Sequence, residues 1–245
     1  MAGVDRRSEP KGRAVRLTTS SSMRVAALLT VANGFVDAYT FIAHGGVFAN
    51  AQTANVVLFG VGLARRDVVN PLAHLWPILA FLAGLSAARA LKTPSAKAAL
   101  RYPRRFSLLV QITVLIIVGG LSQTTPQWVI TTTIGFVSAL QLSLFRTVRS
   151  ATFVTVAMTG NLLRVTEALH DAVRGSRRER QRAALYVTLI VGFAGGAVVG
   201  ALITVHLDTR AAWVPAGIIA LALAQYTIDD LRRRRTASPL AVPAT

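Results

Sequence analysis

Residues 34–38, with the sequence GFVDA, occur a second time with one change as residues 135–139, GFVSA. The similarity continues, because Phe48 and the segment QTAN at 52–55 are matched by Phe153 and the segment MTGN at 158–161. An apolar stretch follows in both copies. A duplicated apolar unit around a polar Thr-x-Asn motif predicts an internally symmetric membrane protein, with its functional site where the two halves meet.

The composition supports a membrane protein. The 245 residues are 53% hydrophobic and only 15% charged, which is more apolar than an ordinary soluble domain of this size. The formal net charge is +17, but the basic residues cluster between apolar stretches, as in cytoplasmic loops, so we expect no nucleic-acid partner. The chain has no cysteine, which excludes disulfides and thiol chemistry.

Six stretches are long enough to cross a hydrocarbon core, which takes about 20 helical residues. Two further apolar stretches are shorter and more polar, and each follows a Thr-x-Asn motif. The six long stretches are 24–43, 72–91, 106–122, 126–145, 184–205 and 211–229, and the two short ones are 51–64 and 158–172.

Lysine and arginine are enriched on the cytoplasmic side of membrane proteins, so their placement tests the number of crossings. Six crossings with a cytoplasmic N-terminus put 24 of the 27 inside, whereas eight crossings would leave nine outside. The same arrangement starts three spans on the outside with a tryptophan each, as an interfacial belt would require. These are Trp76, Trp128 and Trp213. We therefore expect a multi-pass protein of the cytoplasmic membrane with both termini cytoplasmic.

Six crossings divide the chain into two copies of three, at 23–122 and 123–231, between basic tails at 1–22 and 232–245. An odd number of spans inverts the second copy relative to the first. The predicted fold is an all-α integral membrane protein of six transmembrane helices in two inverted three-helix repeats. In each repeat the short stretch is a re-entrant or broken helix, and the two enter from opposite faces.

Two interpretations are open for Thr53-x-Asn55 and Thr159-x-Asn161. Thr and Asn are common N-cap residues, so they could only cap two buried helix starts. Alternatively they line a polar path, because the N-terminus of a half-helix offers free N–H donors to anions or neutral polar solutes.

Asp37 lies inside the first span, one helical turn after Asn33, where an ionisable residue is costly and faces the bundle interior. It is either a proton- or cation-coupling carboxylate or a structural acid bonded to polar neighbours. The second copy has Ser138 at this position and Gln141 one turn later. If a path exists for a solute or an ion, we expect it to include these two residues, Asn33 and Arg164.

Arg164 follows Asn161 by three residues on the second short stretch. It could pair with Glu167 on the same helix, or reach Asp37 across the interface between the copies, because opposite charges at depth are less costly together.

Small residues recur at intervals of four on the second and fifth spans, a spacing that allows close helix packing within the chain or between protomers of a homo-oligomer. They are Ala80, Gly84 and Ala88 on the second span, and Gly192, Gly196 and Gly200 on the fifth.

No catalytic or metal-binding motif is present in the sequence, and we expect neither an enzyme nor a metal or cofactor. The four histidines match no ligand spacing and are expected at the surface or the membrane interface. They are His44, His74, His170 and His206. The basic residues 232–235 are expected to orient the chain and touch anionic lipid.

The stretch 34–41, GFVDAYTF, followed by 46–57, GVFANAQTANVV, resembles the signature of the YoaK-type family of bacterial multi-pass membrane proteins. The resemblance extends over about residues 24–230 and includes Thr159-Gly160-Asn161. This chain has Ala54 where the family pattern has glycine. The resemblance implies an inner-membrane protein and assigns no catalytic residue.

The sequence therefore favours passage of a small solute across the membrane, by a secondary transporter or channel. A non-transporting scaffold or regulator is the alternative. A polar cavity that reaches both Thr-x-Asn motifs would favour transport, and a packed interior would favour a scaffold.

Overall fold

The computed structural model describes residues 20–65, 70–145, 147–148, 151–152, 158–173 and 176–237. Its main helices are α1 (Ser20–Ala43), α2 (Gln52–Ala64), α3 (Pro71–Ala90), α5 (Pro103–Gly119), α6 (Gln127–Phe145), α7 (Met158–Val173), α8 (Arg177–Leu207) and α9 (Trp213–Ala237). Shorter elements are α4 (Pro94–Ala99), the 3₁₀ helix η1 (Asp208–Ala212) and an antiparallel strand pair, β1 (Thr147–Val148) with β2 (Ala151–Thr152).

Each stretch predicted from hydropathy is a helix, with α8 and α9 extending furthest beyond the predicted bounds. Ser176 caps α8 by accepting a hydrogen bond from the backbone N–H of Glu179, so this helix begins before its apolar part. The helix α9 continues through residues 232–237, which the sequence assigned to a tail. The remaining tail residues, 1–19 and 238–245, lie outside the described ranges.

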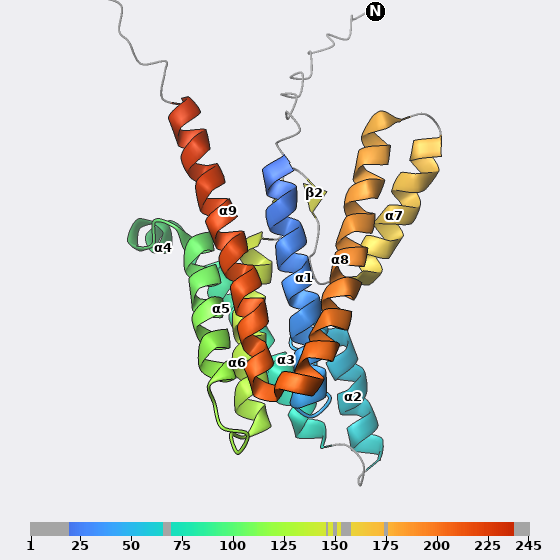
Figure 1. Ribbon diagram of the computed structural model, residues 1–245, viewed down its shortest axis with the longest axis vertical. Coiled ribbons are helices and arrows are strands. Elements are labelled where there is room, and N and C mark those ends of the chain that lie inside the picture. The colour runs from blue at the N-terminus through green and yellow to red at the C-terminus, as the bar shows by residue number, and fades with distance from the viewer. Residues whose placement is uncertain are drawn as a thin grey trace, which may run out of the picture.

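Four stretches are apolar and long enough to cross a membrane, judged by length and composition: Met23–Ala43, Pro71–Ala90, Gln127–Phe145 and Glu179–Arg232. The last covers 54 residues and includes both α8 and α9. The helix α8 ends at η1, where the chain reverses, and α9 runs back in the opposite direction (Figure 1). Many large apolar side chains on these helices are exposed, among them Leu79, Leu82 and Leu202. Such helices are consistent with a multi-pass membrane protein.

The helices form an elongated bundle (Figure 1). We call the end at which η1 joins α8 to α9 the lower end, and the end at which α1 begins and α9 ends the upper end. The helix α1 runs from the upper to the lower end, and α2 then runs toward the lower end again. The helices α6 and α7 both run toward the upper end, opposite to α1 and α2.

The helix neighbours in the two halves correspond. The helix α1 packs against α8 and α9, and α6 packs against α3 and α5. The helix α2 packs against α3, α7 packs against α8, and α5 packs against α9. One hydrophobic core joins α1, α5, α6, α9 and η1, and its largest fully buried side chains include Phe35, Tyr39, Leu108, Ile134 and Ile219.

Glycines allow backbones to approach closely where α1 meets α8 and α6 meets α3. A Cβ at Gly34 would collide with the carbonyl oxygen of Phe193, and one at Gly200 with the backbone of Phe35. On the other side, Gly135 faces the carbonyl oxygen of Pro77. A Cβ at Gly84 would collide with the carbonyl oxygen of Phe136.

Candidate functional site

The segment between α1 and α2 turns back into the bundle. Gly45 and Gly46 have φ values of 75° and 73°, which glycine adopts without strain, and they reverse the chain after α1. Thr40 then accepts a hydrogen bond from the backbone N–H of Ala49 at 3.2 Å. The chain therefore runs back along α1, so α2 begins beside residues 33–40 of α1 rather than beyond its end.

Asp37 binds the returning segment at Asn50. The carboxyl group is buried, and its Oδ1 accepts a hydrogen bond from the backbone N–H of Asn50 at 2.7 Å. The side-chain amide of Asn50 donates to the backbone carbonyl of Asn33 at 3.3 Å. The other carboxyl oxygen of Asp37, Oδ2, has no hydrogen-bond partner among the described residues. Asp37 thus holds the returning segment through Oδ1.

Asn55 fixes the start of α2, although not by capping it. Its Oδ1 accepts a hydrogen bond from the N–H of Phe48 at 3.0 Å, and its Nδ2 donates to the carbonyl of Phe48 at 2.7 Å. The N-cap of α2 is Ala51, which makes no side-chain capping bond. Thr53 is the second residue of the helix and is exposed. The capping interpretation is therefore wrong for Thr53 and Asn55.

The second copy shows the same division between buried and exposed residues. Asn161 is buried on α7 and Thr159 is exposed. On α6, Ser138 and Gln141 are fully buried. The Ser138 hydroxyl and both amide atoms of Gln141 lack hydrogen-bond partners among the described residues.

Arg164 is half-buried on α7, and Glu167 is exposed. Within the described ranges, no ion pair joins Arg164 to Glu167 or to Asp37. The small residues lie at helix contacts: Gly196 and Gly200 pack on α1, Gly192 touches Val31, and Ala80 and Ala88 are buried with Gly84 on α3.

Four buried polar residues were either not singled out from the sequence or expected at the surface. Asn50 and Gln111 were not singled out, yet both are buried, and neither amide atom of Gln111 has a partner among the described residues. His44 and His74 were expected at the surface and are buried. Gln111 stands alone in an apolar stretch, the signal that identified Asp37. His44 adjoins the re-entrant turn, which local sequence does not reveal.

A cavity of about 660 Å³ opens at the lower end between the α5–α6 loop and η1. It is lined by residues 119–123, 206–210 and Trp213. A smaller cavity of about 90 Å³ shares Ser122, Gln123, Asp208 and Thr209 with it and reaches His44. The residues of the two Thr-x-Asn motifs line neither cavity.

His44 lines the smaller cavity and contacts Tyr39 of the core. Its Nε2 lies 2.8 Å from the hydroxyl oxygen of Tyr39, which donates to the carbonyl of Thr209 at 3.2 Å. Burial lowers the pKa of His44 to about 4, although the nearby charge of Asp208 opposes this shift. His44 is therefore neutral at pH 7. Asp208 has a φ of 48°, an uncommon conformation for a residue with a side chain.

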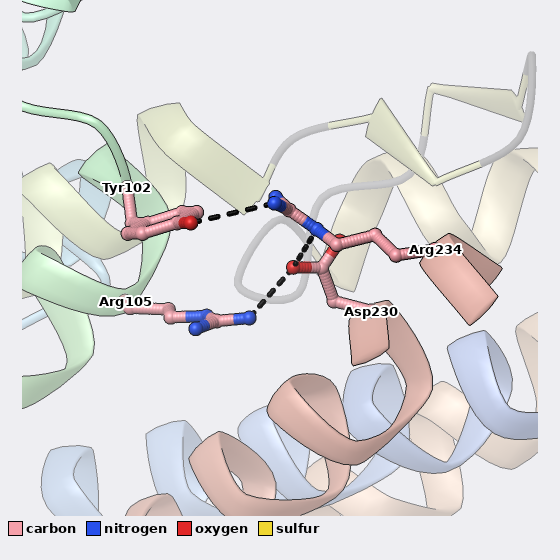
Figure 2. A network of polar contacts seen from close by, with 4 residues as sticks. All are labelled: Tyr102, Arg105, Asp230 and Arg234. Atoms are coloured by element: carbon pink, nitrogen blue, oxygen red, sulfur yellow. Dashed lines mark hydrogen bonds and ion pairs between the residues drawn. The ribbon is translucent and has the colours of Figure 1, made fainter. Parts of the chain in front are cut away.

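Basic side chains join helices at the upper end (Figure 2). Arg105 pairs with Asp230 at 2.6 Å, linking α5 to α9, and Arg234 pairs with the same carboxylate at 3.2 Å. Lys92 and Arg104 donate to the last carbonyls of α6, those of Ser143 and Leu144, at 2.7 and 3.0 Å. Cations there also oppose the partial negative charge of a helix C-terminus.

A family model described as a protein of unknown function, DUF1275, matches residues 25–225. The chain belongs to this family. The match includes the similar segments 34–38 and 135–139, and the YoaK-type resemblance is consistent with it. Neither a curated protein nor a solved structure matches the chain.

Proposed function

We propose that this DUF1275 protein crosses the cytoplasmic membrane six times, in two inverted copies. Helices α1, α3 and α5 form the first three crossings, and α6, α8 and α9 form the second three. The glycine contacts support this correspondence, because the contacts between α1 and α8 match those between α6 and α3 at equivalent positions. Adding 101 to the numbers on α1 and 116 to those on α3 converts Gly34 and Phe35 to Gly135 and Phe136, and Pro77 and Gly84 to Phe193 and Gly200.

The distribution of charge and tryptophan supports a cytoplasmic upper end. Arg105 and Arg234 lie at this end, together with α4 and the start of α1 (Figures 1 and 2). The helices α3, α6 and α9 begin at the lower end, and the tryptophan near each start is about half exposed. Exposed indoles at one level and arginines at the other are the pattern of the two membrane interfaces.

Within this arrangement, we propose that the protein passes a small polar solute across the membrane. The observation that carries this proposal is the Asp37 carboxyl group, which is buried on α1 and whose Oδ2 has no hydrogen-bond partner in the described part of the chain. An acid at this depth is costly, by about 3 kcal/mol on insertion scales, and such residues commonly serve ion or substrate pathways.

Neighbouring features support a path from the lower end. Asp37 lies seven residues before His44 along the chain, which is about 10 Å along a helix. His44 borders the smaller cavity, and that cavity adjoins the larger opening. The N-terminus of α2 begins near Asp37, and helix N-termini favour neutral or anionic hydrogen-bonding groups. We therefore expect a neutral or anionic polar solute, with proton coupling at Asp37.

Uptake by reconstituted vesicles tests the proposal. A panel of small polar solutes is screened with and without a pH gradient, first on the unaltered chain and then on Asp37→Asn. We expect one solute class to accumulate under a gradient, and Asp37→Asn to abolish the gradient dependence with the helical content unchanged. The matched control is Thr53→Ala, because Thr53 is exposed near the same segment and should leave uptake intact. Full gradient-driven uptake by Asp37→Asn would contradict the proposal.

One observation favours the alternative, a scaffold or regulator that transports nothing. The polar atoms of Asn55 bond to the returning segment, and neither Thr-x-Asn motif lines the lower cavities. If this alternative holds, no solute accumulates, and Asp37→Asn only lowers the unfolding temperature, because it weakens the hydrogen bond to Asn50.

A further inference from the structure

Three guanidinium groups surround the ring of Tyr102 at the upper end. Their Cζ atoms lie 4.6 Å from the ring centre for Arg105, 5.2 Å for Arg234 and 5.5 Å for Arg101. The arginines come from distant parts of the chain, because Arg101 and Arg105 flank the start of α5 at Pro103, whereas Arg234 lies near the end of α9 at Ala237. The ring attracts each cation, but the three cations repel one another.

The acidic side chains on these helices do not balance this charge. Asp230 pairs with both Arg105 and Arg234 through the same Oδ2 atom (Figure 2). Asp229 accepts hydrogen bonds from Gln225 instead. Three arginines against Asp230 leave two positive charges in excess, and Arg104, next to Arg105 in the sequence, adds to the positive field.

Two further observations indicate that the cluster has hydrogen-bond donors to offer to an anion. The Nε of Arg105 is buried and has no hydrogen-bond partner among the described residues. Tyr102 is the N-cap of α5 but makes no side-chain capping bond, and Pro103 occupies the first turn. The free N–H groups of that turn, and the partial positive charge of the helix N-terminus, are suited to an anion beside the arginines.

We propose that this cluster, formed by Tyr102, Arg101, Arg105 and Arg234, binds the phosphate of an anionic phospholipid. A phosphate offers several acceptor oxygens, which match the forked donors of more than one arginine and the Tyr102 hydroxyl. The apolar surfaces of α5 and α9 lie below the cluster, where the acyl chains of a lipid would lie, and Leu109 and Leu221 are exposed on them. Because the cluster joins α5 to α9, the bound lipid would also hold the last helices of the two copies together.

Lipid binding is measured on the purified full chain in detergent, by native mass spectrometry and by the shift in unfolding temperature. The probes are phosphatidylglycerol, phosphatidylcholine and inorganic phosphate. The test variant is Arg101→Gln with Arg234→Gln, which leaves the Arg105–Asp230 pair in place. The matched control is Arg65→Gln with Arg210→Gln, which removes the same charge from exposed positions elsewhere in the chain.

We expect phosphatidylglycerol to bind and stabilise the unaltered chain, and phosphatidylcholine to do neither. The test variant should weaken phosphatidylglycerol binding by about tenfold or more, and the control by less than about twofold. Equal weakening in the two variants would mean that overall charge attracts the lipid, and would overturn the proposal. Stabilisation by inorganic phosphate to the same extent would identify free phosphate as the ligand and overturn the lipid assignment.

Discussion

At the scale of single residues, Asn55 and Thr53 lie two positions apart in one motif but have different surroundings. Asn55 is fully buried and satisfies both backbone groups of Phe48, while Thr53 is exposed. A buried backbone group that loses its partner costs about 1–3 kcal/mol. Of these two residues, Asn55 is therefore the one that stabilises the re-entrant segment.

We predict that Asn55→Ala lowers the free energy of unfolding by about 2–4 kcal/mol, because the N–H and the carbonyl of Phe48 are both left unpaired. Thr53→Ala should change it by less than about 0.5 kcal/mol, as at most exposed positions. Denaturation in detergent micelles measures both variants. Equal losses would show that the two residues share one role.

His44 predicts a dependence of stability on pH. Its pKa is about 4 in the folded chain and 6.5 when unperturbed, so the unfolded chain binds the proton first as the pH falls. The unfolding free energy should therefore decrease below pH 6.5, by about 2 kcal/mol between pH 7 and pH 5, and His44 should contribute no pH dependence above that range.

Comparison of His44→Gln with His206→Gln isolates this contribution. His206 is exposed, so its replacement should leave the pH dependence as it is in the unaltered chain. Replacement of His44 should flatten the dependence between pH 7 and pH 5. An unchanged slope in His44→Gln would exclude His44 as its source.

The sequence identified part of the polar site and could not identify the rest. Asp37 was visible because a charged residue interrupts an apolar stretch, and Gln111 carried the same kind of signal. Asn50 carried none, because it lies in a short polar segment that resembles an ordinary loop. Its burial arises from the re-entry of that segment beside α1, which depends on tertiary hydrogen bonds to Asp37 and Thr40.

At the scale of helices, hydropathy predicted the apolar part of each helix but not its charged ends. The helix α9 extends to Ala237, and an ion pair between Asp230 and Arg234 spans one of its last turns. Contacts between helices depend on shape instead, and the glycines show where backbones must approach. Gly34 faces the backbone of α8 without room for a side chain, whereas Gly195 on α8 faces open space.

We predict opposite effects for alanine at these two glycines. Gly195→Ala should raise the unfolding free energy by about 0.5–1 kcal/mol, because alanine favours the helix. Gly34→Ala should lower it by about 1–3 kcal/mol, because the added methyl group separates α1 from α8. Thermal unfolding of the two variants makes the comparison. Stabilisation by Gly34→Ala would show that α1 and α8 are not in close contact.

At the scale of the whole molecule, the central claim is that two inverted copies give six crossings. The helix α5 is decisive, because it is not among the four stretches that length and composition single out, yet an inverted repeat requires it to cross. It joins α4 at the upper end to the loop that contains Thr124 at the lower end (Figure 1). The two ends of α5 must therefore face opposite sides of the membrane.

The chain has no cysteine, so single cysteines at Ser95, on α4, and at Thr124 report these two sides without background. The measurement is labelling by a membrane-impermeant thiol reagent, in intact cells and after permeabilisation. Six crossings predict that Thr124→Cys is labelled in intact cells and that Ser95→Cys is labelled only after permeabilisation. Labelling of both positions from the same side would contradict six crossings and, with them, the inverted repeat.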